Sequence, residues 1–157
     1  MNVFASAVST APNAGDAARE ACAAIRDAMG DSRVDLVVVF ATPDLMANAV
    51  GIAAIFDDAL TPAHMIGCTA EAVIGTGQEV EDGPALSAWA ASLPGAAIES
   101  FVLDPATAPD GAAMVVGWPP HVDPAAPHDL AADDAVIILA DPFTFPPDAL
   151  NDADGHA

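Results

Sequence analysis

The residues with the most potential for chemistry follow the apolar run at 64–66, where a predicted strand gives way to a glycine-rich loop. Ligands in open α/β sheets bind outside the carboxyl ends of such strands. Glycines let backbone N–H groups approach a ligand closely there, although they serve tight turns equally well. The candidate ligand-binding residues are Gly67, Cys68, Thr69, Glu71, Gly75 and Gly77.

Cys68 is the candidate nucleophile in this group. A reactive thiolate needs a nearby base or positive charge, and no lysine or arginine follows Arg33 in the chain. Only a histidine such as His64 could activate the thiol. We therefore interpret Cys68 as an inert thiol or a ligand contact, and we predict no catalytic residue and no enzyme. A cysteine-dependent enzyme that uses Cys68 remains the alternative.

The loop matches neither a phosphate-binding nor a metal-binding pattern. No lysine follows its glycines, and the acidic residues Glu79, Glu81 and Asp82 would repel phosphate. Together with Glu71 these acids lack the fixed spacing of a calcium loop. The four histidines and two cysteines form no HxxxH or CxxC pattern, so no metal site is predicted.

Charge is the most unusual global property of the chain. Twenty-three acidic residues face three basic ones, which gives a formal net charge of −20. Phosphate backbones and anionic lipids are bound through Lys and Arg, so we expect no nucleic-acid partner and no membrane surface as a partner. Such acidity is typical of a solubilising or salt-adapted surface, and attraction of a cationic ligand or partner is the alternative.

The N-terminal segment and the cysteine content indicate where the protein works. The first ten residues have neither a basic region nor an apolar run of signal-peptide length, and no apolar stretch is long enough to span a membrane. Two cysteines are too few for a disulfide framework. We expect a cytoplasmic protein with no membrane insertion.

Strand and helix patterns alternate in the first part of the chain. Residues 3–8 and 34–41 are apolar runs, and the second is continuous, as in a central strand covered on both faces. A helix is predicted over 14–29, with Gly30 as its C-cap. Its buried positions recur at helical spacing: Ala18, Cys22, Ile25 and Met29.

A second helix is predicted to begin at Thr42 and Pro43, and a third strand near His64. The alternating order of strands and helices favours parallel pairing through right-handed crossovers. The predicted inner face of the second helix comprises Met46, Ala49, Val50, Ala53, Phe56 and Leu60.

Beyond a loop at 67–84 the pattern changes. Strands predicted at 85–92 and 97–103 flank Pro94 and Gly95, which favour a type II turn and therefore a hairpin with mixed pairing. The proline-rich stretch 104–134 is predicted to be mostly loop. The run AVIILA at 135–140 predicts a further buried strand, followed by a short helix from Pro147.

The predicted fold class is therefore α/β: a mixed sheet with a βαβαβ start, a following β-hairpin and a further strand, with helices packed on the sheet. A chain of 157 residues fits one domain, expected over residues 1–150. Residues 151–157 are expected to form a flexible polar tail.

Three segments carry a family resemblance. The segment IGCTAEAVIGTGQEVEDGPALSAWAASLPGA at 66–96 resembles the motif block of FIST N-terminal domains. VVVFATPD at 37–44 resembles the second strand of that family, and ILADPFTFPPDAL at 138–150 resembles the strand and turn that close its N-terminal half. With the helix at 14–29, the resemblance to the N-terminal half of a FIST domain covers almost the whole chain.

The resemblance implies a sensory module that binds a small ligand, proposed to be an amino acid or a similar metabolite, and signals to attached or neighbouring proteins. Some relatives are haem-binding nitric oxide sensors, so haem is a cofactor that the resemblance allows and a gas sensor is an alternative function. The family continues into a C-terminal half. We therefore expect such a half or a partner chain, or self-association, to complete the module.

Overall fold

The computed structural model describes residues 1–75, 77–109, 111, 113–123, 131, 133–141 and 143–145. The chain divides into two compact units, Met1–Glu99 and Ser100–Ala157, and each is described by itself. The single domain expected over residues 1–150 stays a prediction, and the expected tail at 151–157 lies outside the described residues.

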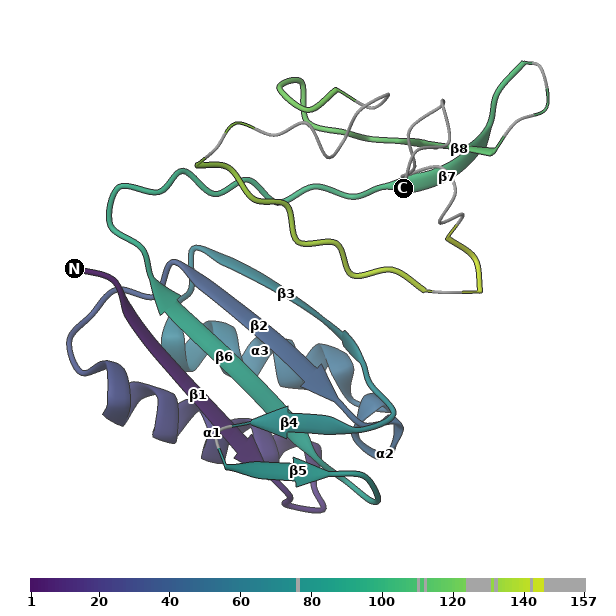
Figure 1. Cartoon of the computed structure of the whole chain (residues 1–157). Helices are drawn as coiled ribbons and strands as arrows, with labels where there is room; N and C mark the ends of the chain where they lie inside the picture. The colour runs from purple at the N-terminus through teal and green to yellow at the C-terminus, as the bar shows by residue number, and fades with distance from the viewer. Residues whose placement is uncertain are drawn as a thin grey trace. The chain divides into compact units, whose positions relative to one another are not determined.

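Among its described residues, the first unit contains three helices and six strands (Figure 1). In chain order they are β1 (Val3–Ser9), α1 (Ala14–Met29), β2 (Leu36–Ala41), α2 (Pro43–Met46), α3 (Ala49–Leu60), β3 (His64–Thr69), β4 (Val73–Gly75), β5 (Gln78–Val80) and β6 (Leu86–Ser92). The predicted strands near 3–8, 34–41 and 64, and the helix at 14–29, are confirmed.

Four of these strands form one mixed sheet in the order β1-β6-β2-β3. Strands β2 and β3 are parallel, with Val39 opposite Gly67. Strand β6 runs antiparallel to both of its neighbours, β1 and β2. The strands β1, β2 and β3 consequently point in the same direction, although β1 and β2 are separated by β6. The prediction of an α/β fold with a mixed sheet and packed helices is confirmed.

Helices α1 and α3 cover one face of the sheet (Figure 1). The core between them and the sheet is rich in alanine, which buries little apolar area per residue, and the large side chains are few. Phe56, Ile25 and Leu60 are fully buried there. The four positions predicted for the inner stripe of α1 are all buried.

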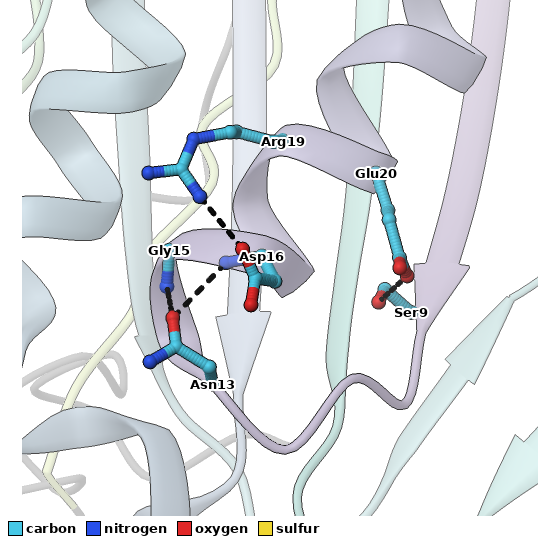
Figure 2. A network of polar contacts seen from close by, with 6 residues as sticks. All are labelled: Ser9, Asn13, Gly15, Asp16, Arg19 and Glu20. Atoms are coloured by element: carbon cyan, nitrogen blue, oxygen red, sulfur yellow. Dashed lines mark hydrogen bonds and ion pairs between the residues drawn. The ribbon is translucent and has the colours of Figure 1, made fainter.

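Helix α1 begins at a cap that satisfies its first free N–H groups (Figure 2). The Asn13 side-chain oxygen accepts hydrogen bonds from the N–H groups of Gly15 at 2.9 Å and Asp16 at 3.2 Å. At the same end of the helix, the Ser9 hydroxyl donates to the Glu20 carboxylate at 2.5 Å and ties β1 to α1. Gly30 ends the helix with a φ of 57°, as its position in the sequence predicted.

The second predicted helix is interrupted. Helix α2 ends at Met46 and α3 begins at Ala49, so the expected continuous inner face is wrong in its details. Val50, predicted to be buried, is 85% exposed, whereas Ile52 is buried. The other predicted inner-face residues are buried or half-buried, so Val50 is the one position assigned to the wrong face.

The hairpin predicted between 85–92 and 97–103 does not form. The turn itself does: Gly95 has a φ of 95°, and the Ala96 N–H donates to the Leu93 carbonyl at 3.0 Å. Strand β6, however, is hydrogen-bonded on both edges, to β1 and to β2. Because no edge of β6 is left free, residues 97–103 cannot pair with it, and they contain no strand.

The segment 67–84, predicted to be a loop, contains the end of β3 and an antiparallel pair formed by β4 and β5. This pair lies over the face of the sheet opposite the helices (Figure 1). The Ser87 hydroxyl donates to the Ile74 carbonyl at 2.7 Å and fixes β4 to β6.

The second unit contains an antiparallel pair, β7 (Asp104–Thr107) and β8 (Ala113–Val116), within the stretch predicted to be mostly loop. The buried strand predicted at 135–140 is wrong, because these residues have no regular structure and Ile137 is 54% exposed. An apolar run forms a strand only where another strand offers a partner edge. The helix expected from Pro147 lies outside the described residues.

Candidate ligand-binding site

A cavity of about 220 Å³ lies at the β3 side of the sheet, between β2 and β3 and the helices α2 and α3. Its lining comes from all four elements and includes both sides of the helix break. The lining residues are Val39, Ala41, Met46, Ala49, Ile52, Ala53, Met65, Ile66, Gly67 and Cys68.

The space exists because small residues meet at this position. Ala49 and Ala53, one helical turn apart on α3, and Gly67 of β3 all line the cavity. A Cβ atom at Gly67 would lie 2.4 Å from the Val39 carbonyl oxygen, so a side chain there would disturb the pairing of β2 with β3. The glycine is therefore required by the sheet itself, whatever else it contacts.

The lining is chemically simple. It contains no charged side chain, and the Cys68 thiol is its one side-chain hydrogen-bond donor, a weak one. Met46 and Met65 contribute flexible thioether chains that adapt to irregular shapes. The cavity can therefore bury an apolar group, whereas it offers no side chain that could neutralise a buried charge.

The structure brings some of the six predicted site residues together and separates others. Gly67 and Cys68 line the cavity, and Cys68 is exposed at the surface of β3. Thr69 ends β3 and Glu71 follows it, both exposed at the same carboxyl end of the strand.

Gly75 and Gly77 lie elsewhere. A Cβ atom at Gly75 would come within 2.1 Å of Val8 Cγ2, which places this glycine against β1 on the face opposite the helices. Gly77 has a φ of 74° in the connection between β4 and β5. Gly75 therefore allows β4 to approach β1 closely, and Gly77 allows the turn between β4 and β5.

Sequence reasoning missed the helical half of the cavity. Met46, Ala49 and Ala53 were assigned to an ordinary core-facing stripe, since their spacing is that of any packed helix. The only sequence feature that could have indicated the cavity was the small size of Ala49 and Ala53 on α3 and of Gly67 on β3. Small residues indicate a cavity only when it is known that α3 and β3 lie beside the same space.

The three arginines make contacts outside the cavity lining. The Arg19 guanidinium pairs with Asp16 at 2.8 Å, and Arg33 pairs with the buried Asp35. Arg26 donates from Nη2 to the Ala59 carbonyl at 3.0 Å. These are the only three Lys or Arg residues of the chain. Within the described part of the chain, no group of three or more His, Cys, Asp or Glu side chains is arranged to hold a metal ion.

Comparison with known proteins finds a family match over more than half of the chain. Residues 35–153 match the FIST N domain, a stretch that includes β2, both cavity helices and β3. This chain belongs to the FIST family. The match confirms the resemblance noted in the sequence. FIST domains are a sensory domain family of signal transduction. The match does not specify a ligand.

Two relatives of the FIST chain come from mycobacteria. An uncharacterized protein of Mycobacterium tuberculosis strain H37Rv is 33% identical over 143 residues, which cover 91% of this chain and 34% of that protein. An uncharacterized protein of Mycobacterium bovis is 32% identical over the same coverage. The chain spans about a third of the length of these relatives. No solved structure matches the chain.

Among the described residues, no helix combines the length and the apolar character that crossing a membrane requires.

Proposed function

We propose that this FIST chain is a ligand-binding sensory module and that a small molecule binds in the cavity between β2, β3, α2 and α3. The observation that carries the proposal is the cavity itself, with its volume of about 220 Å³ and its apolar lining. For scale, an engineered apolar cavity of about 150 Å³ takes up benzene. The cavity is therefore large enough for the side chain of an amino acid or a metabolite of similar size.

The position of the cavity also supports a sensory role. Met46 and Ala49 stand on either side of the interruption between α2 and α3, and both line the cavity. A bound molecule contacts the end of one helix and the start of the next, so its presence would bias their relative position. In this proposal that displacement is the signal passed to an attached C-terminal half or a neighbouring protein.

We further propose that the module is not an enzyme and works in the cytoplasm. The cavity lining contains no histidine, carboxylate, lysine or arginine that could act as a base beside Cys68. Cys22 and Cys68 are both unpaired, and Cys68 is exposed. An exposed free thiol is typical of a reducing compartment.

A thermal-shift screen of amino acids and metabolites of any charge tests the proposed function. A cavity ligand at about 100 times its Kd should stabilise the protein by about 2.7 kcal/mol. Replacing Ala53 with Met fills the cavity and should remove the shift. Ala54→Met adds the same side chain at the neighbouring exposed position of α3 and should leave the shift intact. The proposal fails if a folded protein responds to no compound in the screen.

The cavity lining gives no support to a histidine-ligated haem, because it contains no histidine. We expect titration with haem to give no defined Soret band. A band that disappears when one histidine is replaced would instead favour the gas-sensor alternative.

A further inference from the structure

We propose that the cavity selects a small apolar amine and discriminates against the matching carboxylic acid. This inference rests on the proposed function, because it names the chemical class of the ligand for the same site. It follows from three independent observations: the lining of the cavity, the positions of the arginines, and the charges that follow the carboxyl ends of β2 and β3.

The lining requires an apolar body. All of its side chains are aliphatic, thioether or thiol groups, apart from Gly67, which has none. A carboxylate or phosphate inside the cavity would lose its hydration and find no side-chain donor stronger than a thiol. Burial of a hydrocarbon or aromatic body in the cavity is favourable, because it removes apolar surface from water. Met46 and Met65 can adjust to the shape of such a body.

None of the three arginines lines the cavity, and each has another contact in the fold. Arg19 and Arg33 are paired with carboxylates, and Arg26 is hydrogen-bonded to the Ala59 carbonyl. The chain contains no other Lys or Arg. An acid bound in the cavity would therefore have to displace an existing arginine contact or remain without a cationic partner, and either choice weakens its binding.

An acidic residue follows each of the two cavity strands. The parallel pairing places Ala41 opposite Thr69 at the ends of β2 and β3. Asp44 follows shortly after β2, and Glu71 follows shortly after β3, and both residues are exposed. An ammonium group at this end of the cavity is attracted by these two carboxylates, whereas a carboxylate there is repelled.

The test uses three probes with the same phenyl body: phenethylamine, 3-phenylpropionate and uncharged ethylbenzene. Isothermal titration at low ionic strength should show phenethylamine binding about tenfold or more tightly than 3-phenylpropionate, with ethylbenzene between them. Added NaCl at about 0.5 M should narrow the difference by screening the exposed carboxylates. Equal or tighter binding of 3-phenylpropionate overturns the inference.

Two sets of variants locate the effect. Ala53→Met should abolish binding of all three probes, and Ala54→Met should preserve it. The double variant Asp44→Asn and Glu71→Gln should bring phenethylamine to the affinity of ethylbenzene and leave ethylbenzene unchanged. Because both carboxylates are exposed, this variant should keep the fold. An unchanged preference for the amine in the double variant would contradict the proposal that Asp44 and Glu71 attract the ammonium group.

The remaining outcomes separate this inference from the proposed function. If the broad screen finds an anionic ligand whose binding Ala53→Met removes, the sensory function stands and the amine preference is wrong. If neither the phenyl probes nor any screened compound binds, both fail. Self-association that Ala53→Met abolishes would assign the cavity to a second copy of the chain and would also overturn the inference.

Discussion

Asp35 organises the start of β2 through two hydrogen bonds to one buried carboxylate. The Leu93 N–H donates to it at 2.6 Å and Arg33 Nε at 2.6 Å, and the Asp35 side chain is only 5% exposed. These contacts join β2 to the turn after β6. The Leu93 hydrogen bond is the largest cause that holds the pKa of Asp35 below its ordinary value, with Arg33 and His64 contributing and burial opposing.

Replacing Asp35 with Asn should lower the stability of the protein near neutral pH, because it removes the charge that these donors stabilise. Since the pKa is depressed on folding, the contribution of Asp35 is present above its ordinary pKa of 3.8 and is lost as the pH falls through the lower folded value. The difference between wild type and Asp35→Asn in denaturant midpoint should therefore shrink on acidification below about pH 4. A difference in denaturant midpoint that stays constant over this pH range would contradict a stabilising role of the ionised Asp35 carboxylate.

The two cysteines should differ in reactivity. Burial raises the pKa of the Cys22 thiol to about 11, with the Arg26 charge opposing the shift, whereas Cys68 is exposed. A thiol reagent near pH 8 should label one cysteine of the folded protein rapidly, at Cys68, and both cysteines after denaturation. Peptide mass spectrometry identifies the labelled residue. The variant Cys68→Ser should show no rapid labelling, and equal rates at the two thiols in the native protein would be inconsistent with the structure.

At the scale of elements, helix α3 determines both the core and the cavity. Phe56 on its inner side is fully buried against the sheet and α1, whereas Val50 on the same helix is exposed to solvent. The alanines Ala49 and Ala53, which lie on the same side of α3 as Phe56, line the cavity. One helix thus supplies a packing anchor and part of the cavity lining, because small and large side chains follow one another along its inner side.

The variant Phe56→Ala should destabilise the protein by about 3–5 kcal/mol, since it leaves a void in a core with few other large side chains. Val50→Ala provides the matched control on the exposed side and should change the stability by about 0.5 kcal/mol or less. Urea titration followed by circular dichroism measures both. Similar losses for the two variants would show that α3 is rotated about its axis relative to the structure described.

At the scale of the whole molecule, the dominant property is a formal net charge of −20 with a sequence pI of about 4.1. So many like charges on a compact chain repel one another and favour expansion. Two of the three arginines are paired with carboxylates, which relieves little of this repulsion.

Thermal stability should therefore increase with salt at neutral pH. Raising NaCl from low millimolar concentration to about 0.5 M should raise Tm by a few degrees, because about 1 kcal/mol corresponds to about 2–4 °C at this chain length. The control is the same salt series near the pI, where the net charge is small and the effect should nearly disappear. A Tm that is independent of salt near neutral pH would mean that charge repulsion contributes little to stability.

Much of the fold was predictable because local patterns are strong at those positions. The alternation of apolar runs identified β1, β2 and β3, and the helical spacing of Ala18, Cys22, Ile25 and Met29 placed α1 at its observed bounds. Gly30 and the turn at Pro94 and Gly95 were also recognisable, since a positive φ favours glycine. Two of the predicted site residues at the carboxyl end of β3, Gly67 and Cys68, line the cavity, and their role in ligand binding stays a prediction.

The partners of each element were decided by tertiary structure alone. Strand β6 inserts between β1 and β2 and uses both of its edges, so the turn that follows it leads to no hairpin. The run at 135–140 has the composition of a buried strand but no regular structure. A sequence determines which residues prefer an extended or helical backbone, whereas hydrogen-bonding edges and helix rotation depend on residues far away in the chain. The cavity belongs to this second class, because its lining combines residues of β2, β3, α2 and α3 that are distant in the sequence.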